Sequence, residues 1–304
     1  MDTPESIWAE QRKAFPLAWR VDLVGLLDRV ERACALDSAE LLTRWLSVYD
    51  EGFRFLVALY MAADDGLQEI TSPTEKGSAG VALLAIGRSS ALARAVRLLV
   101  SHGLEEVARP TARTLVETLD LMTVLIADPE FADAFGPDDP AHDESAFWKA
   151  NIGYGRIGSR LAAIWQSVGA TPEQVTTLNN DRAALGRALS LSVHGSTSAT
   201  FRSSFVPSLR NPGLLSRSFL GHVSVHSPAL LVRIAGAIHT TGVTLLKLLQ
   251  LWDRAVLLQA IPAGANLQTL LAAHFALEAT LERLAGGLPE IDENLESDDP
   301  DKEL

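Results

Sequence analysis

The sequence predicts an all-α fold: a bundle of about eight to ten helices with one long, irregular segment rich in Ser and Arg. Helix-capping signals recur at the spacing of consecutive helices. Val and Ile never alternate with polar residues for long enough to predict a strand. The 304 residues are 47% hydrophobic, which suffices for a sizeable core. We expect a single helical domain over residues 1–288, in which residues 1–70 can form a subdomain.

Periodicity and capping residues define the first four predicted helices. The first carries apolar residues at helical spacing: Leu17, Val21, Val24, Leu27 and Val30. Asp37 and Glu40 form a capping-box pattern that opens the second. Ser78 is placed to cap the third, which Gly103 ends, and Pro110 predicts a kink inside the fourth. These helices are expected at residues 16–36, 37–63, 79–102 and 104–127.

The second half of the chain contains the clearest helix start. Thr171 is a capping residue, Pro172 occupies the first helical position and Gln174 completes a capping box. Ser227 and Asn266 are the corresponding starts of the last two helices. The four helices of this half are expected at residues 145–168, 171–194, 228–255 and 266–285.

The segment from residue 195 to residue 227 breaks this pattern. It is rich in Ser and Thr, contains no acid, and carries Arg202, Arg210 and Arg217. A connection longer than about 15 residues without structure of its own is uncommon in a compact domain and is often functional. We therefore consider these arginines as nucleic-acid ligands, beside the alternative of an ordinary irregular connection.

The net charge of −12 is unevenly distributed. Residues 128–144 contain seven acids without a Lys or Arg, and residues 289–304 contain eight acids and one Lys. Residues 145–288 contain twelve Lys or Arg and five acids, so this part is basic. By composition, residues 289–304 form an acidic, disordered tail, which is dispensable for folding or binds a protein partner.

Several features indicate a cytoplasmic protein without a metal or another cofactor. Cys34 is the single cysteine, so no internal disulfide can form, and its apolar neighbours predict a buried residue. The most hydrophobic stretch, residues 228–252, is interrupted by Arg233, His239 and Lys247, which favours a core helix over a membrane span. Residues 1–20 carry charges without an apolar run, so no secretory signal is expected there.

Two polar insertions in apolar helices are the candidate sites. Arg113 and Glu117 are four residues apart on one helix face, and Asp120 continues that stripe. The residues around them are apolar on nearly all sides, so we expect Arg113 and Glu117 to be buried and paired. They form either part of a site or an internal ion pair that fixes the register of the helices.

The second insertion contains Arg187, Ser190, Ser192 and His194. Arg187 and His194 are two helical turns apart and thus share one face, with Ser190 between them. An arginine and a histidine placed together can hold a phosphodiester and move protons around it without a metal. The structural alternative is that His194 is a capping or core residue.

The order of these two insertions resembles a poorly characterised all-helical bacterial family. The resembling motifs are R-T-L-V-E at 113–117 and L-S-V-H at 191–194, and the resemblance covers about residues 80–205. The spacing of Arg187 and His194 also resembles the R-x(4–6)-H signature of the HEPN-type helical ribonucleases of toxin and antiviral systems. In those proteins a small polar residue follows the arginine, whereas this chain has Ala188.

The resemblance implies an RNA-directed module of a bacterial conflict, antiphage or toxin-type system that can act as a metal-independent endoribonuclease. Arg187 and His194 would be its catalytic residues, supported by Arg113, Glu117, Asp120, Ser190 and Ser192. Two alternatives remain open: a non-catalytic helical interaction or scaffold protein, and a small-ligand sensor. We expect a homo-oligomer in each case.

Overall fold

The structure is a computed structural model that describes residues 23–135, 144–153, 155–190, 204–213, 215–217, 221–251 and 255–285, with Ser6, Ala9 and Lys13. In these residues the chain forms eleven helices and one two-stranded sheet, so the all-α prediction is confirmed. The helices are α2 (Leu23–Leu41), α3 (Thr43–Glu69), α4 (Pro73–Ser101), α5 (Glu105–Ala127), α6 (Pro129–Phe135), α7 (Glu144–Asn151), α8 (Arg156–Ser167), α9 (Pro172–Ser190), α11 (Ser227–Leu251), α12 (Val256–Gln259) and α13 (Ala265–Ala285).

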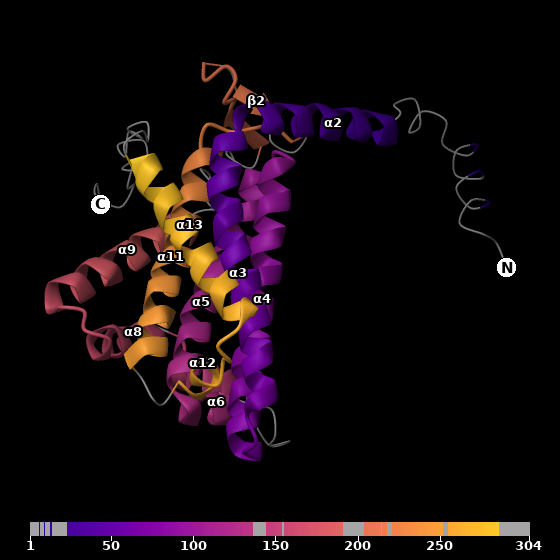
Figure 1. The fold of residues 1–304 in the computed structure, drawn as a ribbon. Coiled ribbons are helices and arrows are strands. Elements are labelled where there is room, and N and C mark those ends of the chain that lie inside the picture. The colour runs from indigo at the N-terminus through magenta and orange to yellow at the C-terminus, as the bar shows by residue number, and fades with distance from the viewer. Residues whose placement is uncertain are drawn as a thin grey trace.

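Five long helices, α3, α4, α5, α11 and α13, form the centre of the molecule. The helix α3 packs against α4, α11 and α13, while α5 packs against α4 and α11. Figure 1 shows α8 and α9 on the opposite side of this bundle from α3 and α4. The buried Tyr49 side chain of α3 donates a hydrogen bond to the carbonyl oxygen of Ala93 on α4, at 2.8 Å. Asp50 and Arg97 form an ion pair one residue further along α3.

The first two helix boundaries differ from the sequence prediction. The helix α2 continues past the expected start at Asp37 and ends at Leu41, and α3 begins at Thr43. Asp37 and Glu40 instead bind the guanidinium of Arg210, at 2.8 and 2.6 Å. Asp37 and Glu40 therefore bind a residue that is distant in the sequence instead of capping a helix.

The start of α4 also differs, while its end confirms the prediction. Ser72, and not Ser78, caps the helix and accepts a hydrogen bond from the backbone N–H of Glu75. Pro73 at the first helical position supports that earlier start. Gly103 ends the helix with a φ of +70°, a conformation that glycine adopts without strain.

The second half follows the prediction with three changes. The acidic segment contains the short helix α6, and the helix expected at 145–168 is divided into α7 and α8 by Gly155, whose φ is +81°. The capping box of α9 is present: the backbone N–H groups of Thr171 and Gln174 each donate to the other residue's side chain. In the expected irregular segment, strands β1 (Phe205–Pro207) and β2 (Leu215–Arg217) pair antiparallel.

Two helices are long and apolar enough to cross a membrane by length and composition alone, α4 and α11. The same property is found in core helices of soluble proteins, so it is weak evidence for a membrane span. The helix α11 packs against α3, α5 and α13 and buries residues along its whole length. This packing agrees with the expected core helix at residues 228–252.

Candidate functional site

The predicted pair of Arg113 and Glu117 is present, but it is not buried. Arg113 donates from Nε to a carboxylate oxygen of Glu117 at 3.0 Å, and the two side chains are 35% and 61% exposed. The neighbouring Leu115, Val116 and Leu119 form the buried faces of α5. The prediction of burial was wrong because the apolar neighbours of Arg113 in the sequence lie on other faces of the same helix.

Asp120 continues the stripe and connects α5 to α9. Its carboxylate pairs with the guanidinium of Arg182, and only 15% of the Asp120 side chain is exposed. The pKa of Asp120 is raised from 3.8 to about 6, with burial as the largest cause. Arg182 lowers this pKa, and the nearby Glu117 adds a smaller rise. Because a carboxyl that titrates near neutrality is uncommon outside functional sites and buried ion pairs, Asp120 stays a site candidate.

The sequence analysis did not identify Arg182 as the partner of Asp120. Arg113, on the same stripe of α5 as Asp120, pairs with Glu117 instead. The sequence did carry a signal for Arg182, because this residue lies on the apolar stripe of α9. The stripe consists of Val175, Leu178, Leu185 and Leu189, which are buried or packed against the core. The position of the pair follows from how α9 packs against α5.

The end of α9 is the part of the second insertion that the structure describes. Arg187 is exposed in the last turn of α9 and forms no ion pair with the described residues. Ser190 donates its hydroxyl hydrogen to the carbonyl oxygen of Gly186 at 2.5 Å. Ser192, His194 and Arg202 lie outside the described residues, so their proximity to Arg187 stays a prediction.

The two other proposed nucleic-acid ligands lie in or beside the hairpin. Arg210 is positioned by Asp37 and Glu40 on α2, and these carboxylates raise its pKa through hydrogen bonds. Its guanidinium thus tethers the hairpin connection to α2 and is already neutralised. Arg217 lies on β2 opposite Phe205.

A buried charged cluster near the start of α5 was not anticipated. Glu105, Glu106 and Arg109 are 2%, 8% and 8% exposed, and Arg109 binds Glu105 at 2.7 Å and lies 3.6 Å from Glu106. The i, i+4 spacing of Glu105 and Arg109 is visible in the sequence, but the burial is not. The cluster explains how two carboxylates can lie inside the bundle: one guanidinium is shared between them.

A pair of stacked histidines, His274 buried and His239 partly buried, was also missed. The rings of His239 on α11 and His274 on α13 are stacked, with centroids 5.3 Å apart and planes at 4°. Phe55 of α3 contacts the edge of His274. Burial lowers the pKa of both histidines, which favours neutral rings. Arg233 and His239 also match the R-x(4–6)-H spacing. In the structure Arg233 is exposed, whereas the His239 ring packs in the core against His274.

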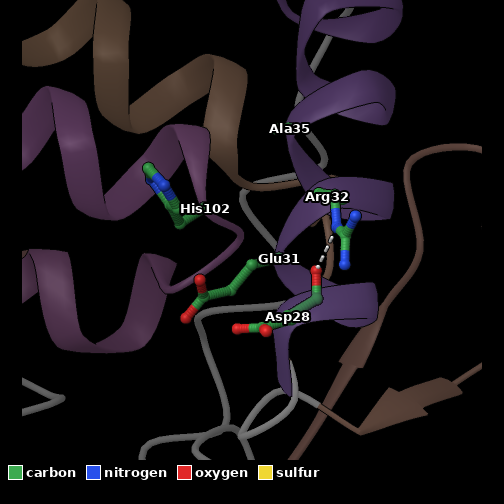
Figure 2. A pocket seen from close by; sticks show the side chains of 5 residues that line it. All are labelled: Asp28, Glu31, Arg32, Ala35 and His102. Carbon is green, nitrogen blue, oxygen red and sulfur yellow. Dashed lines mark hydrogen bonds between the residues drawn. The ribbon is translucent and has the colours of Figure 1, made fainter. Parts of the chain in front are cut away.

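A surface depression lies elsewhere, between α2 and the end of α4. Figure 2 shows its lining residues: Asp28, Glu31, Arg32 and Ala35 come from α2 and His102 faces them from the end of α4. Arg32 donates to the backbone carbonyl oxygen of Asp28, and His102 Nδ1 lies 2.7 Å from the carbonyl oxygen of Leu98. These local bonds orient the Arg32 and His102 side chains toward their own helices.

The described residues contain no group of three or more His, Cys, Asp or Glu side chains able to hold a metal ion. Cys34 is 4% exposed, and burial raises the pKa of its thiol to about 11, as expected of a core cysteine. No protein-family model, curated protein or solved structure matches the chain. The fold defines a multi-helix protein in which the Asp120–Arg182 ion pair connects α5 to α9.

Proposed function

We propose that this chain is a cytoplasmic RNA-directed module of the conflict or toxin type, with the end of α9 as its phosphate-binding element. The observation that supports this is the difference between the arginines. Arg113, Arg182 and Arg210 are paired with carboxylates, whereas Arg187 is exposed and outside every described ion pair. An exposed guanidinium can bind a phosphate in a bidentate manner without first losing a partner.

His194 supplies the chemistry in the catalytic form of this proposal. Its imidazole removes the proton of a ribose 2′-hydroxyl, whose oxygen attacks the neighbouring phosphorus and forms a 2′,3′-cyclic phosphate. The bond between phosphorus and the 5′-oxygen breaks, and the 5′-oxygen takes up a proton from water. Arg187 balances the negative charge that grows on the phosphate oxygens. No metal is needed, because the nucleophile belongs to the RNA.

The test compares Arg187→Met with Arg233→Met, since Arg233 is also exposed on a helix and also precedes a histidine. We expect Arg187→Met to weaken binding of a fluorescein-labelled single-stranded RNA by about tenfold. The slope of log Kd against log salt should fall by about one, as for a lost phosphate contact. Arg233→Met should leave both quantities unchanged. Equal binding by wild type and Arg187→Met would reject the proposed phosphate site.

Catalysis is tested separately, on the same RNA in the presence of EDTA. His194→Ala should abolish cleavage and retain binding, with an unchanged melting temperature. A fall in stability of about 1–3 kcal/mol, with activity lost only in proportion to folded protein, would identify His194 as structural. No cleavage of varied RNAs by the wild-type protein would exclude the nuclease and leave the binding module.

A second candidate function, a helical interaction protein, is favoured by a different observation. Large apolar side chains are exposed together on α3 and α4, among them Tyr60, Met61 and Leu84. Exposed apolar surface of this kind is typical of protein interfaces. A protein partner could also bind the acidic tail at residues 289–304, which lies outside the described residues.

A further inference from the structure

The outer face of α3 and α4 has the pattern of an interface. Val57, Tyr60, Met61 and Leu84 are 37%, 39%, 50% and 74% exposed. The first three lie at i, i+3 and i+4 on α3, so they share one face. The Tyr60 ring lies beside Gly87 on α4, where an added Cβ would be 3.3 Å from it. Leu84 is one turn before Gly87 on α4, so it lies near the seam between the helices that Tyr60 borders.

No described helix covers this face. Figure 1 shows α3 and α4 at one edge of the bundle, with α5, α11 and α13 on the other side of them. The exposed positions of α4 continue along the same face at seven-residue spacing, through Ala91 to Leu98. The buried positions of α4, such as Ala82, Ile86 and Ala93, lie on the opposite face.

The size of the face matches a protein interface. With 27 and 29 residues, α3 and α4 are each about 40 Å long. Two adjacent helices give a width of about 20 Å, because helix axes lie 8–10 Å apart. The two helices together thus offer at most about 800 Å² of projected surface, which is the area that each partner typically buries in a stable complex.

The charges around the apolar centre are self-complementary. The contacts Asp50–Arg97 and Tyr60–Gly87 show that α3 and α4 are antiparallel, and they align the two helices. Exposed Asp64 lies on one side of Tyr60, and exposed Arg94 lies on the other, with Arg88 near the centre. A two-fold axis through Tyr60 places Asp64 of one copy next to the arginines of the other, and the same contact repeats across the axis.

We propose that the α3–α4 face binds a second copy of this chain, in an antiparallel two-fold dimer centred on Tyr60. The apolar centre and charged rim correspond to the usual anatomy of a protein interface. This inference is independent of the proposed RNA activity, because Arg187 and His194 do not contribute to the face.

The test is the mass of the full chain in solution, by sedimentation at micromolar concentration. We expect twice the 32.7 kDa of one chain for the wild type. Leu84→Glu should raise the dissociation constant at least 100-fold, because both copies place the charge in the apolar centre. The matched control is Leu36→Glu on α2, since Leu36 is 72% exposed and lies off the face; it should leave the dimer intact.

Charge reversal tests the orientation. Asp64→Arg and Arg88→Asp should each weaken the dimer about tenfold, and the double variant should recover most of the affinity. A monomeric wild type overturns the proposal, and so does a monomer that binds phosphatidylglycerol vesicles, since the face would then serve a membrane. A dimer that Leu84→Glu does not weaken also overturns it, as does a double variant weaker than both single variants.

Discussion

Replacing Asp120 by Asn should stabilise the protein, although it removes the charge of a buried ion pair. The pKa of Asp120 is 3.8 when unfolded and about 6 when folded, mainly because burial disfavours the carboxylate. The folded state thus prefers the protonated form, and the associated stability is present below pH 3.8 and lost as the pH rises through 6. The difference of about two in pKa corresponds to about 3 kcal/mol at pH 7 or above.

The assay is urea unfolding, followed by circular dichroism, of wild type and Asp120→Asn from pH 4 to pH 8. The stability gained by the variant should be below about 0.6 kcal/mol at pH 4, grow up to pH 6 and then level off. Arg182 is 26% exposed, so water can hydrate its guanidinium when the charged partner is gone. Asp181→Asn is the control, because Asp181 is exposed beside Arg182 and should shift stability by less than about 0.5 kcal/mol.

Arg182→Met gives the complementary result. It leaves Asp120 buried without a cation, so that the carboxyl stays protonated at neutral pH. The part of the stability loss that depends on the ionisation of Asp120 is then about 1.4 kcal/mol at pH 7 and close to zero at pH 5. If Asp120→Asn instead loses more than about 1 kcal/mol at pH 8, and equally at pH 4, the pair is a net stabilising contact and this reasoning is refuted.

Two further predictions concern the core. Folding lowers the pKa of His239 and His274 below the unfolded value of 6.5. Both rings are therefore neutral in the folded protein above pH 6.5, and the free energy of unfolding falls as the pH drops below this value. The loss is at most about 1.4 kcal/mol per pH unit for each histidine. His274→Phe should reduce this slope in urea unfolding at pH 5, 6 and 7, and an unchanged slope would assign the acid sensitivity to other groups. Gly103→Ala should destabilise the protein by more than about 3 kcal/mol for two reasons. Gly103 has a left-handed φ, and an added Cβ would lie 2.3 Å from the backbone nitrogen of His222 and 2.5 Å from the sulfur of Cys34. Gly169→Ala, with a φ of +91° and open space, should cost only about 1–2 kcal/mol in the same measurement, and similar losses for both would contradict the steric argument.

Local chemistry predicted the start of α9 and the end of α4. The capping box at Thr171 and Gln174 and the stop at Gly103 form as expected because both depend on neighbouring backbone groups. Asp37 and Glu40 carry the same kind of signal, but Arg210 from the hairpin binds them 170 residues later in the sequence. That contact depends on the tertiary fold, so no local rule could predict it.

The burial of charged residues was the least predictable feature. Two Arg–Glu pairs with i, i+4 spacing occur on α5, one of Glu105 with Arg109 and one of Arg113 with Glu117. The first is buried and the second is exposed, although both have apolar neighbours in the sequence. Which face of α5 meets α4 and α11 decides the difference, and only the packed structure contains that information.

The exposure of Arg113 gives a last prediction for the proposed RNA site. An ion pair as exposed as Arg113 with Glu117 contributes about 0–1 kcal/mol, so a phosphate can displace the carboxylate. Arg109 and Arg182 cannot exchange partners so easily, because each would leave a buried carboxylate behind. Arg113 is therefore the arginine of α5 that can join Arg187 on an RNA backbone. Glu117→Gln removes the competing charge and should tighten RNA binding about two- to fivefold, the reverse of the effect of Arg113→Met. Unchanged affinity in both variants would remove α5 from the site and confine phosphate binding to α9 and the segment that follows it.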